Sequence, residues 1–113
     1  MILQVLKIAA AIATIMTGLY SLFKPRDIQG FTGLSAPGGR GITELRAVMG
    51  GFFIGLGGAA LLLNTPEVYI MLGIAYLAVA VVRGVFMFID HSVERSNIIS
   101  VVTEVILGVI LIA

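Results

Sequence analysis

Four long apolar stretches occupy most of the chain, and in each one the polar and smallest residues share a single helical face. Residues three, four and seven positions apart lie on one side of a helix, so each stretch is predicted to be a helix with one polar or small stripe. We expect lipid to contact the remaining apolar faces and the four stripes to face each other. In chain order the stripes are Gln4, Lys7, Ala11, Thr14, Gly18 and Ser21; Glu44, Val48, Gly51, Gly55 and Gly58; Tyr69, Gly73, Tyr76, Ala80, Arg83, Met87 and Asp90; and Asn97, Ser100, Glu104, Gly108 and Leu111.

The lengths of these stretches predict an all-α integral membrane protein. A spanning helix needs about 20 mainly apolar residues, and the runs at 2–23, 43–63, 67–89 and 97–113 provide four. The connection Asn64-Thr65-Pro66 is short, and Pro66 suits the first turn of a helix, so the second and third helices are predicted to form a tight antiparallel hairpin. The expected packing is an up-down four-helix bundle in a single domain, residues 1–113.

Composition supports this class and narrows the chemistry. With 113 residues, 59% hydrophobic and 12% charged, and a mean hydropathy of +1.13, the chain is too apolar for a soluble domain of its length. It has no cysteine and one histidine, so disulfides, metal sites and cofactors are not expected. The formal charge of +1 gives no reason to expect a nucleic acid partner, and membrane lipids are the expected surroundings.

Basic residues outside the helices are concentrated in two connections. The longest loop, 24–42, contains Lys24, Arg26 and Arg40, and the connection 90–96 contains Arg95. By the positive-inside rule these two loops are predicted to be cytoplasmic and both termini to lie outside.

The run Gly38-Gly39-Arg40-Gly41 has the composition of a phosphate-binding loop, but its spacing matches no nucleotide-binding pattern and no strand precedes it. We interpret it as a flexible turn leading into the second helix, with Thr43 as the N-cap. Phe31 and Leu34 would allow the loop to lie in the membrane interface or to fold over the mouth of the bundle.

Charged residues inside the apolar stretches are the candidate site. Arg83 lies seven residues before Asp90, roughly 10 Å inside the helix end, and Glu104 is at similar depth in the fourth helix. An unpaired charge there costs at least about 2.5–3.5 kcal/mol on insertion scales, so an Arg83–Glu104 ion pair is predicted. The full charge cluster is expected in the cytoplasmic half of the bundle and consists of Glu44, Arg46, Arg83, Asp90 and Glu104.

Two interpretations of this charge cluster stay open. One is a structural clamp that, together with the hydroxyls of Ser21, Ser100 and Thr103, fixes which helix faces meet. The other is a binding site, because ionisable groups inside a membrane usually mark a ligand, ion or proton path.

Glycines are concentrated in the second helix. Small side chains let helix backbones approach closely, so Gly50, Gly51, Gly55 and Gly58 predict tight packing against neighbouring helices. Together with Gly57 these glycines lie on more than one face of the helix, and the alternative is a face reserved for oligomerisation.

One segment resembles a known family. Residues 41–51 read GITELRAVMGG, and they are followed by Arg83-Gly84 and Thr103-Glu104. This pattern resembles the small four-helix membrane proteins of the DoxX-like group, in particular a bacterial branch with Glu-Leu-Arg-Ala-x-x-Gly-Gly at the start of helix two. The resemblance spans nearly the whole chain and implies a four-helix fold and an inner-membrane location, but no activity. The matched positions are Glu44, Arg46, Gly50, Gly51, Arg83 and Glu104.

These features favour a non-enzymatic protein whose charged intramembrane cavity binds a small amphipathic molecule, either a lipid or a quinone-like compound. One alternative is an accessory or assembly subunit of a larger membrane complex, or a homo-oligomer, because little of the chain lies outside the membrane. Another is a proton or ion pathway along Tyr69, Tyr76, Arg83 and Asp90. An enzyme is least favoured, because the sequence offers no nucleophile–base pair or metal constellation.

Overall fold

The computed structural model describes residues 1–113 and contains helices and connections but no strand. Four helices are long and apolar enough to cross a membrane: Ile2–Phe23, Gly38–Leu63, Pro66–Ile89 and Arg95–Ile112. The first, third and fourth are α1, α5 and α6. The second is a continuous helix made of α3 (Gly38–Leu45), the π-helical segment η1 (Arg46–Phe52) and α4 (Phe53–Leu63). The predicted class, an all-α protein with four candidate spans, is confirmed.

The chain divides into two compact parts. The terminal part comprises Met1–Ala10 and Asn64–Ala113, and the central part comprises Ala11–Leu63. The terminal part contains the start of α1 with α5 and α6, and the central part contains the rest of α1, α2 (Pro25–Thr32), α3, η1 and α4. Pro66 is in the first turn of α5 as expected, whereas the hairpin of the second and third helices falls across the division and stays a prediction.

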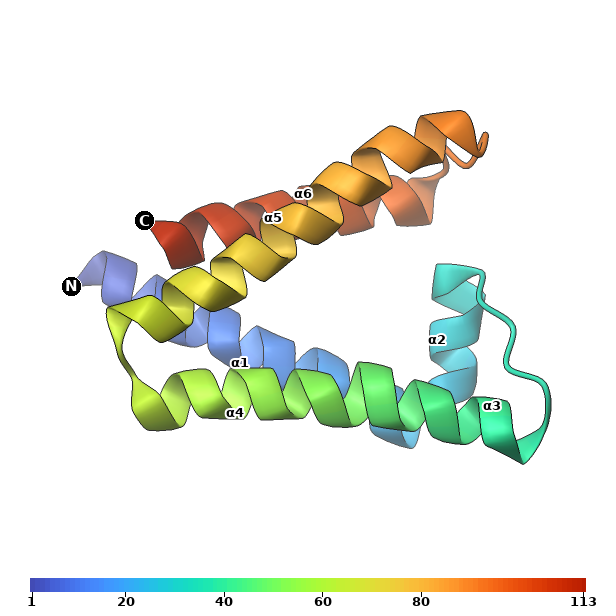
Figure 1. Cartoon of the computed structure of the whole chain (residues 1–113), viewed down its shortest axis with the longest axis horizontal. Helices are drawn as coiled ribbons and strands as arrows, with labels where there is room; N and C mark the ends of the chain where they lie inside the picture. The colour runs from blue at the N-terminus through green and yellow to red at the C-terminus, as the bar shows by residue number, and fades with distance from the viewer. The chain divides into compact units, whose positions relative to one another are not determined.

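In the terminal part, α5 and α6 lie side by side and antiparallel (Figure 1). Their backbones approach closely at two glycines, since a Cβ atom on Gly73 would lie 2.9 Å from the carbonyl oxygen of Gly108. Tyr69, Ala80 and Leu111, from the same predicted stripes, are buried. Over these positions the third and fourth stripes are confirmed as a contact face between helices.

A polar contact ties the start of α1 to the start of α5. The Tyr69 hydroxyl donates a hydrogen bond to Asn64 Oδ1 at 2.8 Å, and Gln4 Nε2 donates to the same oxygen at 3.3 Å. Asn64 has a φ of 49°, a left-handed conformation that asparagine adopts more readily than most residues. Its side chain is therefore held where both helices can reach it.

In the central part, α1 packs against the second span through small residues. A Cβ atom on Gly18 would lie 2.7 Å from the carbonyl oxygen of Gly50, and one on Gly57 would lie 2.6 Å from that of Ala11. Such approaches leave no room for a side chain at either glycine. The first predicted stripe is confirmed over this stretch, where the buried residues are Ala11, Thr14, Gly18 and Ser21.

The face of the second span that packs against α1 is not the predicted glycine stripe. Gly51 and Gly55 are exposed, and a Cβ atom on Gly55 or Gly58 would meet no other atom within 4 Å. Within the central part Gly50 packs against α1 as expected, whereas Gly51, Gly55 and Gly58 do not contact α1, and their close packing against another helix stays a prediction. The buried residues of this span are Leu45, Gly50, Gly57 and Ala60.

The π-helical segment explains this difference. A π-helix forms hydrogen bonds between residues five apart, and Leu45 and Gly50 are separated by five positions across the start of η1. Both therefore fall on the buried face. Continuing an α-helical spacing from Glu44 leads instead to Val48 and Gly51, which are exposed.

The longest predicted loop is partly helical. Helix α2 has Pro25 in its first turn and ends at Thr32, and the following Gly33 has a φ of 77°, the left-handed conformation typical of a glycine after a helix. The glycine run is not a flexible turn, because it forms the first turn of α3, and the N-cap is Pro37 rather than Thr43. Pro37 is extended and Gly38 has a φ of 68°, so the chain turns into the helix five residues earlier than predicted.

Candidate functional site

Arg83 and Glu104 form a bidentate ion pair between α5 and α6. Arg83 Nη2 donates to Glu104 Oε2 at 2.9 Å, and Arg83 Nε donates to Glu104 Oε1 at 3.0 Å. The Glu104 side chain is 13% exposed and the Arg83 side chain 33%. Paired hydrogen bonds of this kind combine charge with fixed geometry. The predicted contact between these two residues is confirmed.

Both residues extend the contact face of their helices. Arg83 lies three residues after the buried Ala80, and Glu104 lies four residues before the buried Gly108, so each shares a face with its glycine or alanine neighbour. Arg83 is seven residues from Asp90, the C-cap of α5, and Glu104 is nine residues from Arg95, where α6 begins. These spacings correspond to roughly 10 and 14 Å of helix, so the antiparallel helices bring the two charges together.

Asn97 connects this ion pair to the turn between α5 and α6. Its Oδ1 accepts a hydrogen bond from Arg83 Nη1 at 3.1 Å, and its Nδ2 donates to the backbone oxygen of Ser92 at 2.8 Å. Sequence reasoning placed Asn97 on the stripe of the fourth helix but gave it no role at the site. The available signal was its position seven residues before Glu104, which is on the same helical face.

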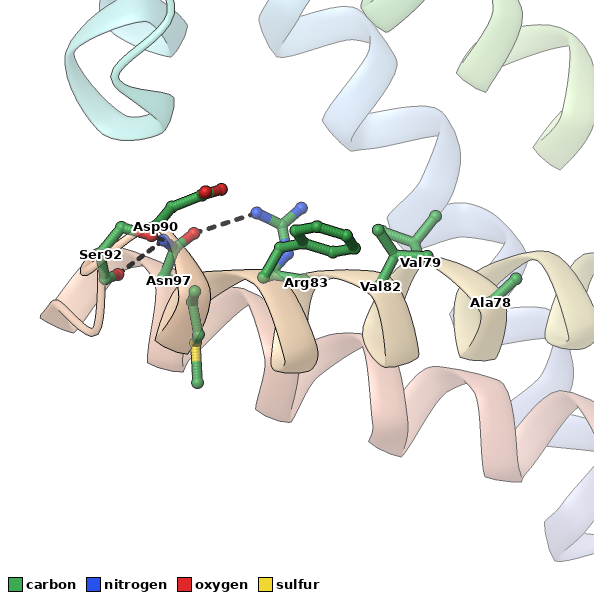
Figure 2. A pocket seen from close by; sticks show the side chains of 9 residues that line it. Ala78, Val79, Val82, Arg83, Asp90, Ser92 and Asn97 are labelled. Carbon is green, nitrogen blue, oxygen red and sulfur yellow. Dashed lines mark hydrogen bonds between the residues drawn. The ribbon is translucent and has the colours of Figure 1, made fainter.

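An open groove of about 540 Å³ lies beside this network in the terminal part. Figure 2 shows Ala78, Val79 and Val82 at one end, Asp90, Ser92 and Asn97 at the other, and Arg83 between them. The groove thus has an apolar end suited to hydrocarbon and an end rich in hydrogen-bonding groups. Its lining residues are Ala78, Val79, Val82, Arg83, Phe86, Met87, Asp90, Ser92 and Asn97.

Arg83 keeps hydrogen-bonding capacity toward a ligand. Each of its terminal nitrogens carries two N–H groups. Nη2 uses one for Glu104 and Nη1 uses one for Asn97. One N–H on each terminal nitrogen is therefore left to donate to an acceptor in the groove.

The other members of the predicted charge cluster are divided between the two parts. Asp90 lies in the terminal part, lines the groove and forms no ion pair there. Glu44 lies in the central part, where its Oε1 accepts a hydrogen bond from Arg40 Nη1 at 2.7 Å, and Arg46 is exposed there. A gathering of all five charges at one site stays a prediction, and the local partner Arg40 was not foreseen.

The helices and their hydropathy define the class of protein as a small multi-pass membrane protein with four candidate spans. No family model, no curated protein and no solved structure matches the chain.

Proposed function

We propose that this protein is a non-enzymatic component of the inner (plasma) membrane that binds a small amphipathic molecule, a lipid or a quinone-like compound, in the groove of the terminal part. The observation that carries the proposal is the distribution of side chains within one groove. Apolar residues line one end, and Arg83, Asn97 and Asp90 lie toward the other. A molecule with a polar head and a hydrocarbon tail matches that distribution.

The size and chemistry of the groove support this reading. Small-molecule sites are mostly apolar hollows of about 300–1,000 Å³ with a few polar groups that fix orientation, and the groove has about 540 Å³. The free N–H groups of Arg83 can donate to a carbonyl or phosphate oxygen of the head. The ion pair with Glu104 holds the guanidinium in place, so little ordering is needed when a ligand binds.

The location is supported by two sequence features. Four apolar helices are long enough to span a bilayer, and residues 41–51 resemble the DoxX-like group of inner-membrane proteins.

The proposal can be tested by blocking the groove. Val82 and Val81 are adjacent on α5 and similarly exposed, at 58% and 66%, but only Val82 lines the groove. Val82→Trp would fill the groove, whereas Val81→Trp adds the same ring to a face outside it. We would purify wild type and both variants from native membranes in a mild maltoside detergent and record native mass spectra.

We expect wild type and Val81→Trp to retain the same bound amphipathic species and Val82→Trp to lose it. Equal thermal stability of the two variants in detergent would show that the loss is not caused by unfolding. Equal retention in all three proteins would exclude the groove as the site and contradict the proposal.

A further inference from the structure

The charges around the groove do not balance, and this imbalance bears on the head group of the ligand. Arg83 is already neutralised by its bidentate contact with Glu104. Asp90 lines the same groove, is exposed, and has neither an ion pair nor a side-chain hydrogen bond. The three groups together carry one net negative charge. An anionic head group would add a second negative charge to this end of the groove.

Besides Asp90, other residues that line the groove are suited to a cation. Phe86 lines the groove and is 48% exposed, and the face of an aromatic ring attracts an ammonium group. Ser92 and Asn97, at the same end, offer oxygen atoms with further acceptor capacity. Ala78, Val79 and Val82 lie at the opposite end, where a hydrocarbon tail would be placed.

We infer that the amphipathic molecule bound in this groove carries an ammonium head group, which Asp90 and Phe86 hold while the tail lies along Val79 and Val82. This inference rests on the proposed function, since it names the chemistry of the molecule bound at that site. An ammonium group can come from a single-chain amine or from a zwitterionic phosphoethanolamine lipid. In the lipid, the phosphate would accept from the free N–H groups of Arg83.

The test compares head groups on one tail. Tetradecylamine, tetradecanol and tetradecyl sulfate differ only in head charge, and their binding to the purified full-length protein in maltoside micelles can be titrated by native mass spectrometry. A second arm compares a phosphatidylethanolamine with a phosphatidylglycerol of identical chains. The variant is Asp90→Asn, and its matched control is Glu94→Gln. Glu94 is also an exposed acid, and its side chain neither lines the groove nor caps α6.

We expect tetradecylamine to bind wild type more tightly than tetradecanol, and tetradecyl sulfate to bind most weakly. Asp90→Asn should weaken tetradecylamine binding by about fivefold, the fold-change for an ion pair at the upper end of the exposed range, and Glu94→Gln should leave it unchanged. All proteins are measured in the same micelles, so partitioning of the amine into detergent affects each affinity equally and cancels in the ratio of affinities between variants. If phosphatidylethanolamine is preferred and the preference is lost in Asp90→Asn, the ammonium group belongs to a lipid. If Asp90→Asn weakens only the binding of tetradecylamine, the ligand is a single-chain amine.

Two outcomes distinguish a failure of the ammonium assignment from a failure of the proposed function. If Val82→Trp abolishes binding but the three head groups bind equally, or the sulfate binds best, the groove is a ligand site and the ammonium assignment is wrong. If Val82→Trp leaves the binding of every probe unchanged, the proposed function itself fails.

Discussion

At the scale of single residues, exposure matters more than distance for the two ion pairs of this protein. Arg40 and Glu44 are closer, at 2.7 Å, but their side chains are 80% and 55% exposed. Arg83 and Glu104 are 2.9 Å apart and 33% and 13% exposed. Pairs exposed to water contribute little, whereas removing one partner of a buried pair leaves an uncompensated charge. The pair between α5 and α6 is therefore the one expected to hold helices together.

This difference leads to a prediction about stability. Arg83→Ala and Glu104→Ala should each lower the free energy of unfolding in detergent by about 2 kcal/mol, less than the 3–5 kcal/mol of a fully buried pair because Arg83 is one-third exposed. The double variant should lose less unfolding free energy than the two single variants lose in sum, because it leaves no unpaired charge. Denaturant unfolding followed by circular dichroism measures all three.

The exposed pair provides the control for this experiment. Arg40→Ala and Glu44→Ala should each change the free energy of unfolding by no more than about 0.5 kcal/mol, as for other exposed pairs one helical turn apart. If Arg83→Ala and Glu104→Ala behave like these controls, the interhelical pair does not act as a structural clamp.

The residue-scale contacts also show what sequence could predict. Arg83 and Glu104 stand in stretches that are otherwise apolar, where an unpaired charge is costly, so their contact followed from sign and depth. Arg40 lies outside the apolar stretches, where an unpaired charge is not costly, and several partners were available to it at the start of the helix. Its contact with Glu44 depends on α3 beginning at Gly38, five residues before the predicted start. Asn97 was missed because a neutral amide inside a membrane does not demand a particular partner.

At the scale of helices, glycines mark the faces on which two helices can pack closely. The second span has glycines on more than one face. Gly50 and Gly57, seven residues apart, lie against α1, while Gly55 and Gly58 meet open space. The sequence pattern could not choose between these faces, since both have helical spacing. The choice depends on η1, whose wider turn brings Leu45 and Gly50 to one side. A local change of helix type is not visible in hydrophobic periodicity. The first stripe contained no such change, and its prediction was correct from Ala11 to Ser21.

The same substitution should therefore have opposite effects at two glycines of α4. Gly57→Ala should lower stability by about 1–3 kcal/mol through overpacking, because its Cβ would lie 2.6 Å from the Ala11 carbonyl oxygen, a backbone atom that cannot rotate away. Gly55→Ala should raise stability by up to about 1 kcal/mol, because alanine favours the helix and nothing lies within 4 Å of the added atom. Thermal unfolding of both variants in detergent measures the difference.

Helix α5 offers a matched check of that reasoning. A Cβ atom on Gly73 would lie 2.9 Å from the Gly108 carbonyl oxygen, whereas one on Gly84 would meet nothing within 4 Å. Gly73→Ala should destabilise and Gly84→Ala should not. Stabilisation by Gly57→Ala or by Gly73→Ala would mean that the helices do not approach each other as closely as described.

At the scale of the whole molecule, the structure shows where the basic residues lie relative to the helix ends. Their distribution bears on the orientation of the protein in the membrane. Lys24 and Arg26 lie at the start of α2, Arg40 lies in the first turn of α3, and Arg95 begins α6. All four are at the ends of helices or between them, within the distance over which basic residues bias insertion. By contrast, the connection Asn64-Thr65 has no basic residue, and Lys7 lies within the first two turns of α1.

This distribution predicts that the connections before α3 and before α6 face the cytoplasm and that both termini lie outside. A fluorescent reporter that folds only in the cytoplasm should be dark when fused after Ala113, and alkaline phosphatase, which is active only outside, should be active there. Inserted into the non-helical segment 33–37, between α2 and α3, the two reporters should give the reverse result. The insertion is a necessary control, because a dark C-terminal fusion alone could reflect poor expression. A bright fluorescent fusion after Ala113 together with active phosphatase at 33–37 would invert the orientation, and the polar end of the groove, which lies near the turn before α6, would then face outward.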